Sequence, residues 1–68
     1  MYPTYESILV NLEDRVATVT INRPESGNAL DPVAYREIRD VFERFGQDPE
    51  VGAIVLTGAG KNFSAGGD

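Results

Sequence analysis

Apolar and polar residues alternate along the first third of the chain with the two-residue period of half-buried β-strands. One such run covers residues 5–12 and a second covers residues 16–22. The polar break between them, residues 13–15, has the length of a hairpin connection. The apolar positions of one face are Ile8, Val10, Leu12, Ala17, Val19 and Ile21. The pattern predicts a β-hairpin after a short lead that Pro3 keeps out of regular structure.

A helical period follows a turn-rich loop at residues 23–28. Asp31 and Pro32 form a helix start, because the aspartate can cap free N–H groups and a proline in the first turn needs no N–H partner. Gly46 is expected to end the helix. The predicted inward residues are Tyr35, Ile38, Val41 or Phe42, and Phe45. The predicted outward residues are Arg36, Glu37, Arg39, Asp40, Glu43 and Arg44, and we interpret the carboxylates Glu37 and Asp40 as solvent-facing, like the turn residues Glu13 and Asp14.

A continuous apolar run, residues 53–56, is typical of a strand buried on both faces inside a parallel sheet. Strand, helix and strand in this order predict a right-handed crossover. The fold class is therefore α/β: a β-hairpin followed by a right-handed βαβ unit. This arrangement leaves sheet edges and one sheet face without a covering layer, so we expect further structure to cover them.

Composition narrows the function. A domain of 68 residues has only marginal folding stability unless disulfides, a metal or a partner add to it. The absence of Cys and His excludes disulfides, thiolate or imidazole metal sites, and Ser/His or Cys/His catalysis. A net charge of −5 with scattered basic residues argues against nucleic-acid binding. We find no signal peptide and no apolar run of membrane-spanning length. The expectation is a cytoplasmic protein without a bound metal, nucleic acid or membrane.

The candidate chemistry lies in the glycine-rich stretch that follows the apolar run, residues 58–68. It is not a P-loop, because Val55 stands where the first glycine belongs and Asn62 follows Lys61. A dinucleotide fingerprint would need glycine at Phe63. Turn formation explains Gly58 and Gly60. The small residues at 65–68 could direct several N–H groups into one space, as an oxyanion hole requires.

Four blocks in this order resemble the amino-terminal part of the crotonase (enoyl-CoA hydratase/isomerase) superfamily. They are Val19-Thr20-Ile21-Asn22-Arg23-Pro24, Asn28-Ala29-Leu30, Ala53-Ile54-Val55-Leu56-Thr57-Gly58-Ala59-Gly60 and Phe63-Ser64-Ala65-Gly66-Gly67-Asp68. The resemblance spans roughly residues 8–68. It implies the crotonase-like (ClpP/crotonase) fold, with residues 1–68 as the amino-terminal part of a single domain whose remainder is absent.

The resemblance also implies a site. The backbone N–H of Gly67 would be one of two oxyanion donors to the thioester of an acyl-CoA. The coenzyme A contacts would come from Asn28, Ala29, Leu30, Ala65, Gly66, Gly67 and Asp68, with Asp68 mainly opening the next helix. Coenzyme A would be part of the substrate rather than a permanent cofactor. The second donor and the acid–base residues would lie beyond residue 68, and the usual oligomer would be a trimer or a dimer of trimers.

Simpler interpretations of these residues stay open. Asn28 also fits a turn residue and Leu30 a core anchor. Arg23 is long enough to reach a phosphate but equally fits an ion pair, and Lys61 is similar. Many members of the family have a basic residue before the asparagine, where this chain has Glu25, Ser26 and Gly27. Two other functions compete: a non-catalytic crotonase-like protein that binds acyl-CoA or a partner, and a small nucleotide-binding βαβ module.

Overall fold

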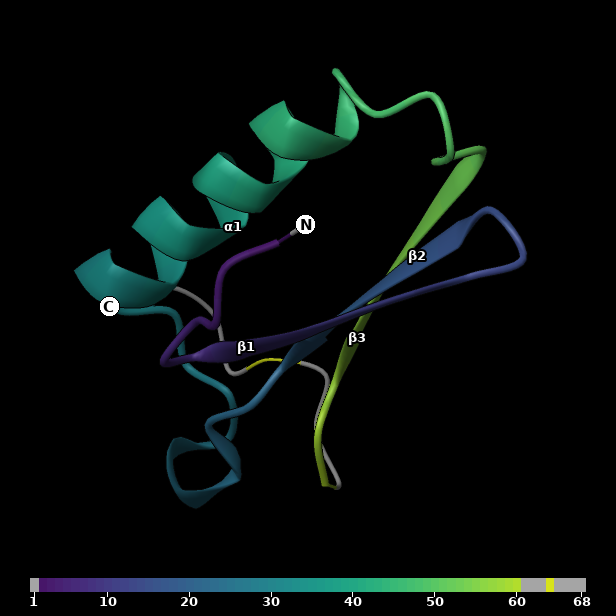
Figure 1. Ribbon diagram of the computed structural model, residues 1–68. Helices are drawn as coiled ribbons and strands as arrows, with labels where there is room; N and C mark the ends of the chain where they lie inside the picture. The colour runs from purple at the N-terminus through teal and green to yellow at the C-terminus, as the bar shows by residue number, and fades with distance from the viewer. Residues whose placement is uncertain (1, 61–63, 65–68) are drawn as a thin grey trace.

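A three-stranded sheet with one helix across it forms the part of the chain that the computed structural model describes, residues 2–60 and 64 (Figure 1). In chain order the elements are β1 (Ile8–Glu13), β2 (Val16–Ile21), the short 3₁₀ helix η1 (Pro24–Ser26), α1 (Pro32–Phe45) and β3 (Ala53–Gly58). The strand order is β1-β2-β3, and α1 joins the neighbouring strands β2 and β3. The predicted hairpin and βαβ crossover are therefore confirmed, whereas η1 was not predicted.

The hairpin has the register that the alternating pattern predicts. β1 and β2 pair antiparallel with Glu13 opposite Val16, which leaves a two-residue turn at Asp14 and Arg15. Both turn residues have positive φ, 51° and 66°, as a tight hairpin turn with a right-handed twist requires. The apolar positions Ile8, Ala17, Val19 and Ile21 are all buried, and they form the sheet side of the core.

Helix α1 begins where the sequence predicts. The side chain of Asp31 accepts a hydrogen bond from the Ala34 N–H at 2.8 Å, and Pro32 stands in the first turn. Its buried residues are Ala34, Val41 and Phe45. The prediction that Tyr35 points inward is wrong, because Tyr35 is 52% exposed. The neighbouring Ala34 is buried instead.

The lead of the chain is fastened to α1 by side chains that we predicted to face solvent. Glu37 accepts hydrogen bonds from the backbone N–H groups of Glu6 and Ser7 at 2.8 and 2.7 Å. Asp40 accepts one from the hydroxyl of Tyr5 at 2.7 Å. The interpretation of Glu37 and Asp40 as purely solvated carboxylates is therefore wrong, because both hold the segment that enters β1.

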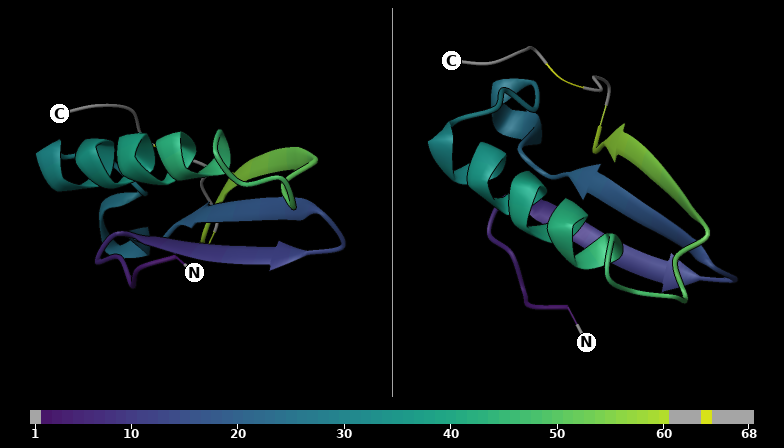
Figure 2. Two further views of the ribbon diagram at one scale, coloured as in Figure 1. Left: turned by 45° about the horizontal axis from the view of Figure 1, so that its top comes forward. Right: turned by 90° about the horizontal axis from the view of Figure 1, so that it is seen from above.

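Strand β3 pairs parallel with β2, as predicted, but it is not buried on both faces. It is the edge of the described sheet, and Ile54, Val55 and Leu56 are 41%, 46% and 39% exposed. Figure 2 shows the reason: seen from above, α1 lies over β1 and leaves β3 to one side. Within the described ranges, 2–60 and 64, no helix is both long and apolar enough to cross a membrane.

Candidate functional site

Two loops meet at the carboxyl ends of the parallel strands β2 and β3, the edge at which ligands bind in open α/β sheets. One loop, residues 22–30, follows β2, and the other begins at Ala59 after β3. The Ala59 N–H donates to the carbonyl of Ile21 at 2.8 Å, so the segments that follow β2 and β3 leave the sheet side by side. The predicted contact segment Asn28-Ala29-Leu30 lies in the first of these loops.

Asn28 joins the two loops from the inside. Its side chain is fully buried, and its backbone is in the left-handed region with φ 60°. The Oδ1 atom accepts from the backbone N–H of Arg23, and Nδ2 donates to the carbonyl of Ala59, both at 2.8 Å. Asparagine suits the position because it tolerates positive φ and offers both a donor and an acceptor. The turn interpretation of Asn28 is confirmed, and its side chain bonds the protein itself.

Arg23 is used within the same loop. Its Nη1 donates to the carbonyl of Ala29 and lies 3.5 Å from a carboxylate oxygen of Asp31. Its side chain is 22% exposed. The charge of the guanidinium is therefore partly balanced by the residue that caps α1, which matches the ion-pair interpretation of Arg23. Ala29 and Leu30 are half-buried beside it.

The second loop also comes close to the first at Gly60 and at Ser64. Gly60 has φ 79°, and a Cβ atom there would meet the Cβ of Pro24 at 3.4 Å. The hydroxyl of Ser64 donates to the carbonyl of Asn28 at 2.9 Å. The remaining predicted residues of this loop, Ala65, Gly66, Gly67 and Asp68, lie outside the described residues, as do Lys61 and Phe63. Their predicted roles stay predictions.

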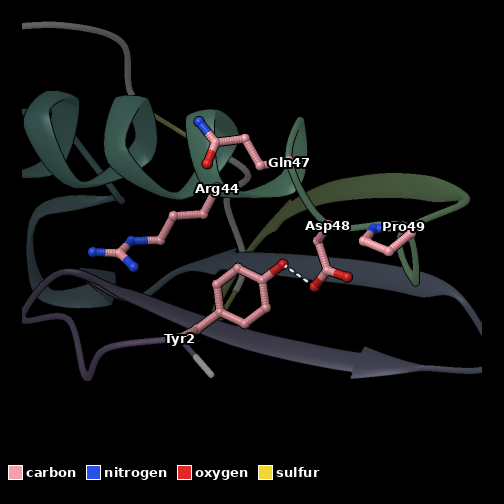
Figure 3. A pocket seen from close by; sticks show the side chains of 5 residues that line it. All are labelled: Tyr2, Arg44, Gln47, Asp48 and Pro49. Atoms are coloured by element: carbon pink, nitrogen blue, oxygen red, sulfur yellow. Dashed lines mark hydrogen bonds between the residues drawn. The ribbon is translucent and has the colours of Figure 1, made fainter.

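The groups with shifted pKa values lie elsewhere. At the end of α1 a cleft of about 370 Å³ is lined by Tyr2, Arg44, Gln47, Asp48 and Pro49. The Tyr2 hydroxyl donates to Asp48 at 2.7 Å (Figure 3). Partial burial and this bond raise the pKa of Tyr2 to about 12, and the same bond lowers the pKa of Asp48. The Tyr2–Asp48 hydrogen bond in this cleft is a structural contact. The cleft lies near the start of β3, not at its carboxyl end.

Where the described residues of the two loops meet, the available groups are mainly backbone groups. Arg23 and Asp31 face each other, and Asn28 carries no charge. In the described part of the chain no cluster of acidic side chains could hold a metal ion. Sequence reasoning named Asn28 but missed its link to Ala59, and it did not single out Ser64. Asn28 could be found from the sequence because an asparagine that follows a glycine in a turn-rich loop tolerates positive φ. A single serine such as Ser64 gives no comparable signal.

The family model described as enoyl-CoA hydratase/isomerase matches residues 11–68. Hydroxycinnamoyl-CoA hydratase-lyase from Pseudomonas fluorescens is 47% identical over 64 residues, which cover 94% of this chain and 23% of that protein. A probable enoyl-CoA hydratase from Rhizobium meliloti is 46% identical over 65 residues, covering 96% of this chain and 25% of the relative. The chain thus spans about a quarter of the length of these curated relatives.

Solved structures agree. An enoyl-CoA hydratase/isomerase from Xanthobacter autotrophicus Py2 superposes with a TM-score of 0.92 at 42% identity, over 96% of this chain and 24% of that one. One from Mycobacterium paratuberculosis also has a TM-score of 0.92, at 34% identity, over 96% of this chain and 26% of its own. The predicted resemblance and the crotonase-like fold are confirmed. The small nucleotide-binding module loses its support.

Proposed function

The chain belongs to the enoyl-CoA hydratase/isomerase family, and from this membership we propose that it contributes the first oxyanion donor to an enzyme acting on an acyl-CoA thioester. The backbone N–H of Gly67 is the proposed donor. The observation that carries the proposal is the pair of loops tied together by Asn28 at the carboxyl ends of β2 and β3, from which Ser64 leads into Ala65-Gly66-Gly67.

The physical reason is the charge that develops during reaction. Hydration or isomerisation next to a thioester moves negative charge onto the carbonyl oxygen, and a fixed N–H dipole in a dry site stabilises this charge more than it stabilises the substrate. A backbone donor needs no titratable side chain, which agrees with the pairing of Arg23 with Asp31 at the first loop. Glycine at 67 leaves room for the acyl chain.

The same proposal assigns the rest of the substrate. We place coenzyme A against Ala29, Leu30, Ala65, Gly66 and Asp68, with Asn28 contributing through its backbone because its side chain is buried. Coenzyme A enters and leaves with the substrate. Residues 1–68 are, in this proposal, the amino-terminal part of one crotonase-like domain in a cytoplasmic enzyme that assembles as a trimer or a dimer of trimers. The exposed apolar residues of β3 support further structure on that strand.

Replacing Gly67 by proline in the complete polypeptide tests the donor, because proline has no N–H. We expect kcat on an enoyl-CoA to fall by about 10²- to 10³-fold. Gly67→Ala keeps the N–H and controls for the added side chain, so it should retain at least about ten times the activity of Gly67→Pro. Turnover of Gly67→Pro within a few-fold of the parent would remove the proposed role.

Binding separates the remaining alternatives. An acyl-CoA without a double bond should bind the complete polypeptide to saturation, whereas ATP and NAD should not. Turnover should be tested with an aliphatic and an aryl enoyl-CoA, because relatives include a hydroxycinnamoyl-CoA hydratase-lyase and a probable enoyl-CoA hydratase. Tight acyl-CoA binding without any turnover would favour the non-catalytic alternative.

A further inference from the structure

We infer that Asn28 and Ser64 are positioning residues that fix the place of the Gly67 N–H, an inference that rests on the function proposed above. Neither residue is expected to touch the reacting atoms. Asn28 is fully buried, and its side chain is bonded on both sides to backbone groups of the protein. Their effect on catalysis would pass through the backbone that follows Ser64.

Asn28 bonds both Ala59 and Ser64 of the segment that follows β3. Its side-chain Nδ2 binds the carbonyl of Ala59, where the chain leaves β3, at 2.8 Å. Its main-chain carbonyl accepts the hydroxyl of Ser64 at 2.9 Å. Ala59 and Ser64 are thus both bonded to a single residue of the preceding loop. Asn28 is itself fixed, because its N–H donates to the carbonyl of Arg23 at 2.7 Å and its Oδ1 accepts the Arg23 N–H at 2.8 Å.

Gly67 is close to Ser64 along the chain. Gly67 follows Ser64 by three residues, and an extended chain spans at most about 3.6 Å per residue, so its N–H lies within about 11 Å of the Ser64 anchor. A donor must come within about 2.7–3.1 Å of the oxyanion, and a misplacement of about 1 Å can lower a rate by about 10²-fold. A shift of the Ser64 anchor would therefore be passed to the donor over only three residues, and a shift of about 1 Å would matter for the rate.

The hydrogen bonds of Asn28 and Ser64 can be removed separately. Ser64→Ala deletes the hydroxyl that binds Asn28 and leaves the Asn28 side-chain bonds intact. Asn28→Asp keeps the acceptor for the Arg23 N–H but turns an acceptor toward the carbonyl of Ala59, which opposes it. Matched controls exist in the same loop. Ser26→Ala removes a hydroxyl that only reaches the carbonyl of Arg23 at 3.2 Å, and Asn22→Asp makes the same charge change on an exposed side chain.

The test measures kcat and KM of the complete polypeptide, together with amide hydrogen exchange of a peptide containing residues 65–67. Ser64→Ala should lower kcat about 10-fold with KM changed less than about two-fold, and it should speed exchange in that peptide about 10-fold. Asn28→Asp should lower kcat about 10²-fold. Ser26→Ala and Asn22→Asp should stay within about two-fold of the parent in all three measurements. Because Ser64→Ala changes one partly buried hydroxyl, it decides the question even where Asn28→Asp fails to fold.

Two results would overturn the inference. One is a Ser64→Ala variant that matches Ser26→Ala in both kcat and exchange. The other is a loss confined to KM, which would make Ser64 a substrate-binding residue. Failure of the proposed function is distinguishable, because a parent without turnover of any acyl-CoA would refute that function while hydrogen exchange still decides whether Asn28 and Ser64 hold the loop.

Discussion

Replacing Glu37 by glutamine would show how strongly the lead of the chain is fastened to helix α1. The Glu37 carboxylate accepts the N–H groups of Glu6 and Ser7 at 2.8 and 2.7 Å, one on each oxygen. Glutamine has one acceptor oxygen, so its NH₂ group must face one of these donors. Ser7 is only 7% exposed, and a buried N–H that loses its partner costs about 1–3 kcal/mol.

Glutamine can accept from only one of the two N–H groups and lacks the charge that strengthens both bonds, so the expected loss for Glu37→Gln is about 2 kcal/mol in the free energy of unfolding. It is measured by urea unfolding of the complete polypeptide at neutral pH, with proteolysis of the lead as a local readout. Glu43→Gln is the matched control on the same helix. Its side chain is 66% exposed and pairs with Arg39 at 3.4 Å, so it should cost less than about 0.5 kcal/mol. Equal losses for the two variants would refute the assigned role of Glu37.

Two further predictions concern pH and the helix cap. Partial burial and hydrogen bonds to carboxylates raise the pKa of Tyr2 and Tyr5 to about 12 from 10.0. The folded state therefore keeps protons that the unfolded state loses, so stability is fully present below pH 10 and falls as the pH rises toward about 12. Circular dichroism should show this decline flattened in the Tyr2→Phe/Tyr5→Phe variant, and an unchanged slope would contradict the assignment. Asp31→Ala should cost about 1 kcal/mol in urea unfolding because the Ala34 N–H loses its cap, and Asp31→Ser should recover most of it. A serine variant as unstable as the alanine variant would count against capping.

The sequence predicted the local structure well because its signals are short-range. The alternating runs predicted the hairpin, and the neighbouring residues Asp31 and Pro32 predicted the start of α1. The face of the helix was less predictable. Residues 34, 38, 41 and 45 and residues 35, 38, 42 and 45 fit the helical period almost equally, and the packing of α1 over β1 decides in favour of the first set.

Contacts between distant segments could not be predicted in this way. In the sequence Glu37 resembles any exposed carboxylate of a helix. Its partner Ser7 lies about 30 residues earlier, so only the folded structure shows the contact. Ser64 lies 36 residues from Asn28, and no local sequence pattern predicts the hydrogen bond between them. The apolar run of β3 correctly predicted a strand. Its predicted burial was wrong for the described residues because β3 forms the edge of their sheet.

The vibrational frequency of the substrate carbonyl tests the central claim most directly. A saturated acyl-CoA labelled with ¹³C at the thioester carbonyl would be bound to the complete polypeptide and to its Gly67→Pro variant, and the carbonyl stretch recorded by infrared difference spectroscopy. A backbone donor that polarises this carbonyl should lower the stretching frequency in the parent relative to the free ligand, and less so in Gly67→Pro. The same frequency in both bound forms would contradict the account.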